Sequence, residues 1–353
     1  MLKRWRRTVT WTDLVVWAIG IAIALAMVYG TIRTVLAGEY TAEQWISLTI
    51  DGLKLGGIYA LIALGYTLVY GIMRMINFAH SEVFMSGPFT AVFLAKYLDN
   101  IGFYNAHPII SIILLTLLSA SVSTIVALLL ERVAYRRLRN APRLVPLITA
   151  IGASFFLQYT FRGLYGNDIE TYPNFDILKG SWNIGSIGIP KASLVVIVAA
   201  FLLMLLLYAI VQFTKTGKAM RSVSEDKDVA ALMGINVDRI IVFTFGIGGA
   251  SAGIAGVLYS LIYQNVHFYM GFIPGLKAFT AAVLGGIGNV VGAWLGGTIL
   301  GILESLGPNL FLSGLGIPAA NQLKDAIAFT ILVFILIFRP SGLLGERLSK
   351  TKA

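Results

Sequence analysis

Apolar segments follow one another along almost the whole chain, and most are long enough to cross a membrane as a helix. A bilayer core about 30 Å thick requires about 20 apolar residues in helical form. The sequence therefore predicts an all-α, polytopic transmembrane helix bundle with about ten membrane segments, some of them broken or re-entrant. We place these segments near residues 12–36, 47–72, 76–97, 108–130, 144–162, 191–213, 240–263, 275–288, 290–307 and 322–338.

Composition supports a membrane protein. Of the 353 residues, 57% are hydrophobic and 12% are charged, whereas a soluble domain needs more charge on its surface. The net charge of +10 would indicate nucleic acid or another acidic partner for a soluble chain, but in a membrane protein the positive-inside rule explains it. The chain has no cysteine and three widely separated histidines, so we expect no disulfide, metal centre or cofactor.

Basic residues are concentrated in four segments that ten crossings place on one side of the membrane. These segments are the amino end, the connection between the fourth and fifth crossings, the loop around residues 214–236, and the carboxyl end. The opposite connections carry acidic residues and few lysines. Because cytoplasmic loops are enriched in Lys and Arg, both termini are predicted to be cytoplasmic.

The domain division follows from the same segments. Residues 1–46 form an extra amino-terminal transmembrane segment, residues 47–345 the main membrane domain, and residues 346–353 a cytoplasmic tail. The basic start and apolar run also resemble a secretory signal, with 35–37 (VLA) as a cleavage site. The apolar stretch exceeds the core of about 7 to 15 residues that such signals have, so we prefer the membrane segment.

The charged stretch Thr214 to Asn236 interrupts the apolar pattern and is typical of a contact with a soluble partner. It has a helical centre and a glycine stop. Positions three apart are neighbours on a helix, so Ala231 and Gly234 are expected on one side, where small residues would form a shallow socket. An ordinary hydrated loop helix is the alternative.

Two polar or glycine-rich interruptions are candidates for a translocation path. At 285–289 (GGIGN), Gly285, Gly286, Gly288 and Asn289 favour a turn over a helix. Irregular backbone at membrane depth is tolerated only where protein or a water-filled cavity surrounds it, so we expect a broken or hairpin element near the path. Plain close packing of helices is the alternative.

The second interruption places Asn77, His80 and Glu82 where the third membrane segment begins. Polar groups inside a membrane are costly, which indicates interior partners or a substrate path. His80 and Glu82 are two residues apart and would diverge on a helix, so they are a poor catalytic pair. A helix-capping or turn role is the alternative for this stretch.

Motifs for ATP binding and hydrolysis are missing from the sequence. The nearest approach to a phosphate-binding loop is 216–219 (TGKA), which lacks the first glycine and the hydroxyl residue. We therefore predict no enzymatic activity, with any ATP hydrolysis carried out by another chain. Glu304, Lys277 and the pair Lys324–Asp325 are expected to be structural or snorkelling charges near membrane edges.

Four segments, taken in order, resemble the permeases of branched-chain amino acid ABC importers. They are GGIYALIALGYTLVYGIMRMINFAHSE, ERVAYRRLRNAPRLVPLITAIGASFFLQ, GKAMRSVSEDKDVAALMGINVDR, and GLKAFTAAVLGGIGNVVGAWLGG with the terminal FRPSGLLG. The resemblance covers about residues 47–345. It departs at Ser81, where the family usually has glycine.

The resemblance implies a bacterial inner-membrane transport subunit and its partners. These partners are a second homologous permease, two ATP-binding subunits on the cytoplasmic face, and an extracytoplasmic substrate-binding protein, with no nucleic acid. The ATPase-coupling position maps on Glu225, Asp228, Ala230, Ala231 and Gly234. The implied substrates are branched-chain or other neutral amino acids; urea or short-chain amides are the alternative.

The long outer loop, residues 163–190, has a composition that suits a docking surface for the binding protein or an idle loop with interfacial aromatics. An ion-coupled secondary transporter is the competing class. It needs intramembrane acids, for which Glu82 is the attractive candidate, and it leaves the charged stretch unexplained. A membrane enzyme needs a clustered acid, base or metal set, which the sequence does not offer.

Overall fold

The computed structural model describes residues 11–139, 141–142, 144–185, 187–339 and 341–345. The amino-terminal basic residues and the tail 346–353 lie outside these residues. The expected membrane segments correspond to the helices α1 (Trp11–Ala37), α2 (Ala42–Met73), α3 (His80–Asn100), α5 (Pro108–Leu130), α6 (Leu144–Tyr165), α7 (Lys191–Phe213), α10 (Val237–Tyr263), α11 (Phe272–Gly285), α12 (Val290–Gly307) and α13 (Lys324–Phe338).

In the described part of the chain, eight helices are long and apolar enough to cross a membrane. The other two expected segments differ for separate reasons. Helix α11 has only 14 residues, and α3 begins with the polar residues His80, Ser81 and Glu82. The chain is thus a polytopic helical membrane protein, as predicted, in which α11 is the short apolar helix expected beside the glycine break.

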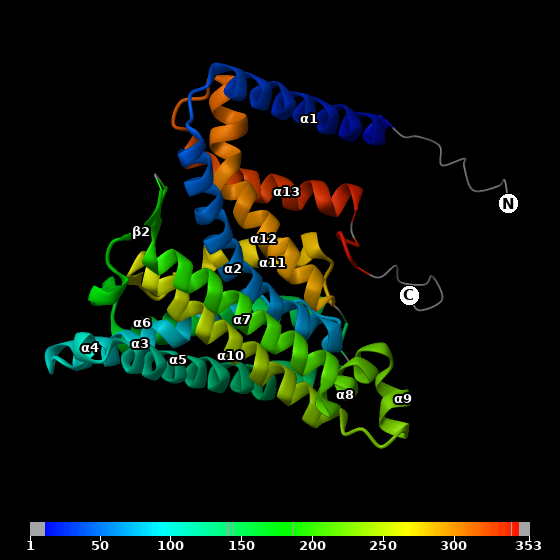
Figure 1. Ribbon diagram of the computed structural model, residues 1–353. Coiled ribbons are helices and arrows are strands. Elements are labelled where there is room, and N and C mark those ends of the chain that lie inside the picture. The colour runs from blue at the N-terminus through cyan, green and yellow to red at the C-terminus, as the bar shows by residue number, and fades with distance from the viewer. Residues whose placement is uncertain (1–10, 140, 143, 186, 340, 346–353) are drawn as a thin grey trace.

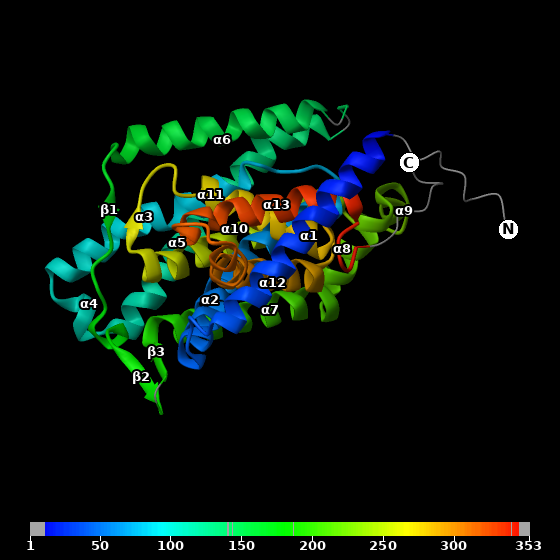
Figure 2. The ribbon, with the colours of Figure 1, turned by 90° about the horizontal axis from the view of Figure 1, so that it is seen from above.

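The ends of the helix bundle differ in character (Figures 1 and 2). The helices α8 (Lys215–Glu225) and α9 (Lys227–Leu232) lie at one end, together with the amino end of α1 and the carboxyl end of α13. We call this the basic end. The opposite end, which we call the loop end, carries α4 (Phe103–Ala106), β2 (Ser181–Ile184) and β3 (Ile187–Pro190). Both views place the basic segments of the described chain together.

Helix α2 forms the centre of the bundle and packs closely against α12. A Cβ atom at Gly56 would lie 2.8 Å from the Cα of Thr298, and one at Gly297 would lie 2.5 Å from the Cα of Ala60. Small residues therefore let these two backbones touch, which is how helices associate in lipid. The close packing predicted from glycine spacing is confirmed here.

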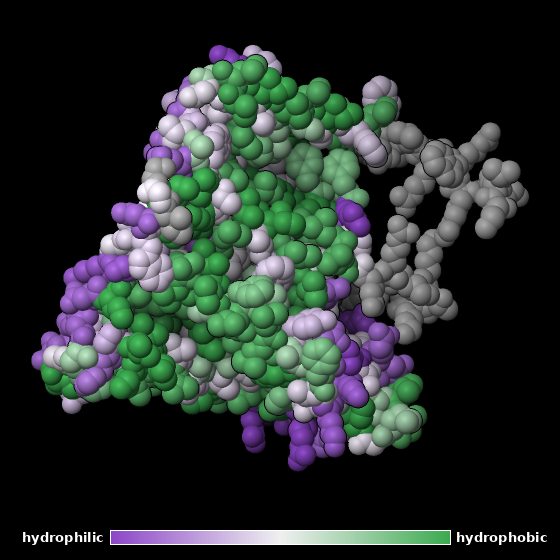
Figure 3. Space-filling model, viewed as in Figure 1, coloured by the Kyte–Doolittle hydropathy of each residue, from purple (hydrophilic) through white to green (hydrophobic). Residues whose placement is uncertain are grey.

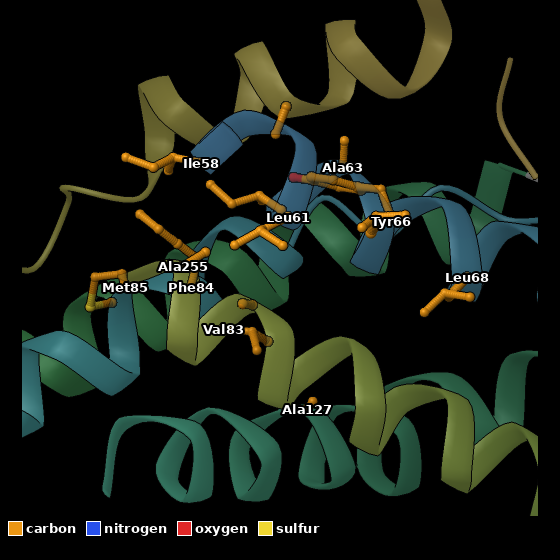
Figure 4. Close-up of a cluster of buried hydrophobic side chains, with 14 of the residues drawn as sticks. Ile58, Leu61, Ala63, Tyr66, Leu68, Val83, Phe84, Met85, Ala127 and Ala255 are labelled. Atoms are coloured by element: carbon orange, nitrogen blue, oxygen red, sulfur yellow. The ribbon is translucent and has the colours of Figure 1, made fainter. Parts of the chain in front are cut away.

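A second layer, formed by α3, α5 and α10, packs against α2 through apolar side chains (Figure 4). Ile58 and Leu61 of α2 lie beside Phe84 of α3 and Ala255 of α10, all buried. Helix α6 runs along one edge of this layer, and α1 lies on the outside (Figure 2). On the face seen in Figure 3, apolar side chains cover most of the surface between the two polar ends, which suits contact with lipid.

The loop end contains two short antiparallel pairs, so part of the long outer loop is ordered. Strand β1 (Glu170–Thr171) pairs with β4 (Asn265–Val266), and β2 forms a hairpin with β3. The remaining elements are single turns: η1 (Glu131–Tyr135), η2 (Arg136–Leu138), η3 (Asp176–Leu178), η4 (Pro308–Leu312), η5 (Ser313–Leu315) and η6 (Ala320–Leu323).

Helix α1 contacts the rest of the bundle at two places along its length. Near its carboxyl end, a Cβ atom at Gly30 would overlap the carbonyl oxygen of Phe311 in η4. Near its amino end, the rings of Trp17 and Phe338 meet edge to face, with centroids 5.7 Å apart. The extra amino-terminal segment is therefore attached to η4 and α13.

Candidate functional site

Local capping explains why α8 and α9 form at the basic end. The Thr214 hydroxyl accepts a hydrogen bond from the Gly217 N–H at 3.0 Å and caps α8. Asp226 Oδ1 caps α9 by accepting from the backbone of Asp228 and Val229 at 2.9 and 3.0 Å. Gly234 ends the segment with φ +83°, a left-handed conformation that glycine adopts without a steric penalty.

The predicted coupling residues lie together at this end, although they do not form the expected socket. Glu225, Asp228, Ala231 and Gly234 are exposed, whereas Ala230 is buried and packs toward the bundle. The expectation that Ala231 and Gly234 share a helical side is wrong, because α9 ends at Leu232. Gly234 is required for the helix stop and not for a close contact within the chain.

The sequence analysis missed an exposed apolar surface on the same segment. Val229, Leu232 and Met233 are 55%, 87% and 78% exposed. Three apolar side chains within one turn and its cap, in an otherwise charged stretch, were the available signal. Exposed apolar surface with a polar rim is typical of a protein interaction site. We call these three residues the α9 apolar surface.

The α8–α9 segment is connected directly to the end of α2. Arg74, which follows α2 in a left-handed conformation, donates a hydrogen bond from Nη2 to the Ser224 carbonyl at 2.7 Å. Burial lowers the pKa of the Lys227 amine, and the neighbouring guanidinium groups of Arg139 and Arg74 lower it further. The α8–α9 segment is therefore hydrogen-bonded to the chain between α2 and α3.

The chain between α2 and α3 re-enters the bundle as irregular backbone. His80, the first residue of α3, fits against Gly65 of α2, where a Cβ atom would overlap the imidazole ring. Gly65 precedes the end of α2 at Met73 by eight residues, or about 12 Å of helix. The polar interruption at Asn77 to Glu82 thus lies inside the helix bundle, surrounded by protein.

Most of the polar side chains in this interruption have hydrogen-bond partners. The Tyr135 hydroxyl donates to Asn77 Oδ1 at 2.6 Å. Glu82 Oε1 accepts from Gln158 Nε2 at 2.8 Å and from the Ser154 hydroxyl at 3.0 Å, both on α6, and the hydroxyl of Ser81 lies 3.2 Å away. Glu82 is fully buried, and its Oε2 atom has no hydrogen-bond partner among the described residues.

Sequence reasoning missed Ser154 and Gln158, the α6 partners of Glu82. They are four residues apart and follow Ala150 on the buried stripe of α6, so a polar pair at helical spacing was the available signal. His80 points elsewhere, toward the Tyr66 ring at a centroid distance of 4.9 Å. The predicted divergence of His80 and Glu82 is confirmed.

The second interruption is a hairpin between α11 and α12. Gly286 and Gly288 have φ values of +105° and +100°, which explains the glycines. Asn289 caps α12 by accepting from the Gly292 N–H at 2.9 Å, and its Nδ2 atom donates to the Leu344 carbonyl at 3.0 Å. The helix is therefore interrupted by a turn between Gly285 and Val290, as predicted.

Residues 341–345, which were not expected at this position, close the hairpin. The Leu343 and Leu344 N–H groups donate to the Leu284 and Gly285 carbonyls at 2.8 and 2.9 Å. A Cβ atom at Gly286 would overlap the backbone of Gly345. The carboxyl-terminal turn therefore satisfies the carbonyl groups that the end of α11 leaves free.

The two interruptions lie at different levels along α2. His80 contacts Gly65, whereas a Cβ atom at Gly288 would lie 4.0 Å from the Cα of Gly71, near the basic end of α2. The two interruptions are therefore separate, but the elements that carry them are in contact. The Phe279 ring of α11 packs against the ring of Phe78, which lies between α2 and α3, with centroids 5.4 Å apart. A single polar cluster is not formed.

Comparison with known proteins identifies the family. Residues 48–336 match the model of the branched-chain amino acid transport system permease component. The chain belongs to this permease family. It is 40% identical over 301 residues to the high-affinity branched-chain amino acid transport system permease protein LivH of Escherichia coli, covering 84% of this chain and 94% of that relative.

Two further relatives extend the comparison. The permease protein BraD of Pseudomonas aeruginosa is 39% identical over 308 residues, which cover 86% of this chain and 96% of that protein. The probable branched-chain amino acid transport permease protein LivH of Methanocaldococcus jannaschii is 29% identical over 301 residues. By its family the permease is a transport component and not an enzyme. Among the described residues, no group of three His, Cys, Asp or Glu side chains is placed to hold a metal ion.

Proposed function

We propose that this permease moves leucine, isoleucine and valine across a bacterial inner membrane as the membrane subunit of an ABC importer. Its partners are a second homologous permease, two ATP-binding subunits and an extracytoplasmic binding protein. The observation that carries the proposal is the similarity to LivH and BraD over nearly their whole lengths, since both are named as permeases of high-affinity branched-chain amino acid transport. The membrane domain comprises residues 47–345, with residues 1–46 as an added segment.

The basic end faces the cytoplasm in this proposal. Arg137, Lys218 and Arg221 are exposed at this end, and cytoplasmic loops are enriched in such residues. The loop end with β2 and β3 then faces outward, where the binding protein docks. Both termini are cytoplasmic, since the amino end of α1 and the carboxyl end of α13 lie at the basic end (Figure 1).

The α8–α9 segment is the contact for an ATP-binding subunit. Its exposed groups combine the α9 apolar surface with the charges of Glu225 and Asp228. A central apolar contact with a polar rim is the usual composition of a protein interface. Ala231 lies beside this surface, Gly234 fixes its end, and Ala230 anchors it to the bundle. Movement of the ATP-binding subunit then reaches α2 through Arg74.

The translocation path passes the start of α3. A zwitterionic amino acid carries two charges that cannot be buried without polar partners. The unpartnered Glu82 Oε2 offers an acceptor for the ammonium group, and the amino end of α3 beside it favours a negatively charged group such as the carboxylate. Gly285, Gly286, Gly288 and Asn289 form a flexible break at the cytoplasmic end of the path.

Reconstitution tests this function. The permease is assembled in proteoliposomes with the second permease and the ATP-binding subunits, and the binding protein is supplied outside the vesicles. We expect ATP-dependent uptake of leucine, isoleucine and valine that stops when the binding protein is omitted. Uptake of urea or acetamide, with no uptake of leucine, would assign the amide alternative. Uptake driven by a proton or sodium gradient without ATP would assign the secondary-transporter class.

A further inference from the structure

A cluster of three charged side chains joins α11, α12 and α13, away from both interruptions. Lys277 Nζ lies 2.7 Å from Glu304 Oε1 and 2.6 Å from Asp325 Oδ1. The Tyr59 hydroxyl of α2 donates to Glu304 Oε1 at 3.3 Å and lies 3.5 Å from Lys277 Nζ. One ammonium group thus connects four helices. Of the two roles expected for these charges, structural pairing is confirmed for Lys277 and Glu304, whereas snorkelling does not apply to them because they are buried in protein.

The two carboxylates of the cluster differ in how far they are buried within the chain. The side chains of Lys277 and Glu304 are 4% and 2% exposed, whereas that of Asp325 is 43% exposed. Glu304 depends on Lys277, because water does not reach it to compensate its charge. The Asp325 side chain reaches the surface of the described chain, although its Oδ1 atom, which contacts Lys277, is itself buried. Asp325 is therefore the partner that can be released.

Stability alone is a poor reason for such a cluster. Well-packed apolar residues often replace a buried ion pair without loss of stability, and ionisable groups inside membranes are costly. This cluster also carries one carboxylate more than its single ammonium group neutralises, and Glu304 Oε2 has no hydrogen-bond partner among the described residues. The arrangement indicates a role in movement.

The helix that the cluster holds is the short helix α11. Lys277 lies near its first turn, opposite Asp325 at the start of α13. At the other end of α11, the carbonyls of Leu284 and Gly285 accept hydrogen bonds from the chain that follows α13. Helix α11 is thus tied to α13 at both ends. The hairpin at residues 285–289 continues directly from it.

We propose that the Lys277–Asp325 ion pair is a releasable positioning contact for α11, closed in this conformation and opened during the transport cycle. Glu304 keeps the Lys277 ammonium neutralised in both states, so release leaves only the partly exposed Asp325 carboxylate without its partner. Lys277 and Asp325 act on the hairpin through α11 and do not touch the substrate. This inference rests on the proposed transport function, because the movement it describes belongs to the transport cycle.

The test compares Asp325→Asn with the matched control Lys324→Gln, which removes an adjacent exposed charge outside the cluster. The complete reconstituted complex is assayed for leucine imported per ATP hydrolysed. Labelling of Ile327→Cys by a maleimide is measured in parallel, because Ile327 is buried against α12 beside Gly307 and the wild-type chain has no cysteine. For Asp325→Asn we expect several-fold less leucine per ATP, retained ATP hydrolysis and faster labelling. Lys324→Gln behaves like the wild type.

A double variant separates positioning from stability. Lys277→Met combined with Glu304→Met removes the buried pair and keeps the volume, so we expect a wild-type unfolding temperature with the same low yield of leucine per ATP. Wild-type yield in either Asp325→Asn or the double variant overturns the proposal. Loss of assembly and ATP hydrolysis in both also overturns it, because the cluster is then a structural anchor. If the wild-type complex imports no leucine, the transport function fails separately, and the labelling of Ile327→Cys alone decides whether Asp325 holds α13.

Discussion

The contact between His80 and Gly65 fixes where α3 begins, because no side chain larger than hydrogen fits between them. Tyr66 packs against the same imidazole ring from α2. The buried His80 Nε2 atom has no hydrogen-bond partner among the described residues. The position of the ring therefore depends on the absence of a methyl group at Gly65.

This steric fit gives a first prediction. Gly65→Ala overpacks the site and should lower the free energy of unfolding by about 1 to 3 kcal/mol. His80→Ala in the same chain removes the ring, so the double variant should recover part of the loss relative to the sum of the single changes. Thermal unfolding in detergent measures all three variants. Strict additivity of the two single effects would show that Gly65 and His80 do not share the contact.

The α9 apolar surface gives a second prediction. Leu232→Ser should leave the free energy of unfolding within about 0.5 kcal/mol, since the side chain is exposed. Binding of the ATP-binding subunit should weaken about tenfold, the loss expected for an interface residue worth about 1.4 kcal/mol. Ile177→Ser, an exposed apolar residue at the loop end, is the matched control. Equal affinity in the two variants would place the ATPase contact elsewhere.

The sequence predicted which polar residues lie within the apolar segments, but it did not predict the residues to which they are hydrogen-bonded. Asn77 and Glu82 were identified because polarity inside an apolar segment is visible in one sequence. Ser154 and Gln158 were missed. A Ser and a Gln on an otherwise apolar helix indicate a buried contact only when the acceptor opposite them, here Glu82, is known. The partners of Glu82 come from a helix more than 70 residues away in the chain.

Among the elements, α6 depends on few contacts for its attachment to the bundle. It lies along one edge in Figure 2, and its buried stripe is narrow. The hydrogen bonds from Ser154 and Gln158 to Glu82 tie its middle to α3, and the Tyr165 hydroxyl bonds Thr90 at 3.1 Å nearer the loop end. Polar contacts thus give α6 its position.

The third prediction concerns this attachment. Gln158→Leu removes a donor from a buried carboxylate and should destabilise the permease by about 1 to 3 kcal/mol. Thr160→Val is the matched control on the same helix, because its hydroxyl bonds only the Phe156 carbonyl within α6. Unfolding temperature and leucine uptake are measured for both. If Gln158→Leu matches the control in both measurements, Glu82 does not hold α6.

Helix existence was predictable and helix boundaries less so. Apolar length identified all the long helices, and glycines with a following asparagine identified the α11–α12 hairpin. The depth of that hairpin was not predictable, because it depends on residues 341–345 folding back onto Gly286. A local sequence pattern does not show which distant segment will donate hydrogen bonds to the free carbonyl groups at the end of a helix.

For the whole molecule, orientation is the property that the charge distribution predicts. The fourth prediction uses the cysteine-free chain as its background. Single cysteines at Arg137 and Lys218, exposed at the basic end, should resist a membrane-impermeant maleimide in intact cells. A cysteine at Ile177 in η3 should react. Permeabilised cells, in which all three should be labelled, provide the control, and labelling of Arg137→Cys from outside would reverse the topology.

The closure of the hairpin by residues 341–345 sets an order of events during synthesis. Leu284 and Gly285 leave the ribosome well before Leu343 and Leu344, which supply the N–H groups that bond their carbonyls. Until α13 has entered the membrane, the end of α11 has no protein partner for those two carbonyls. Docking of the carboxyl-terminal turn therefore follows the insertion of α13, and we expect a chain that stops before Leu343 to insert its helices but leave the hairpin without this closure.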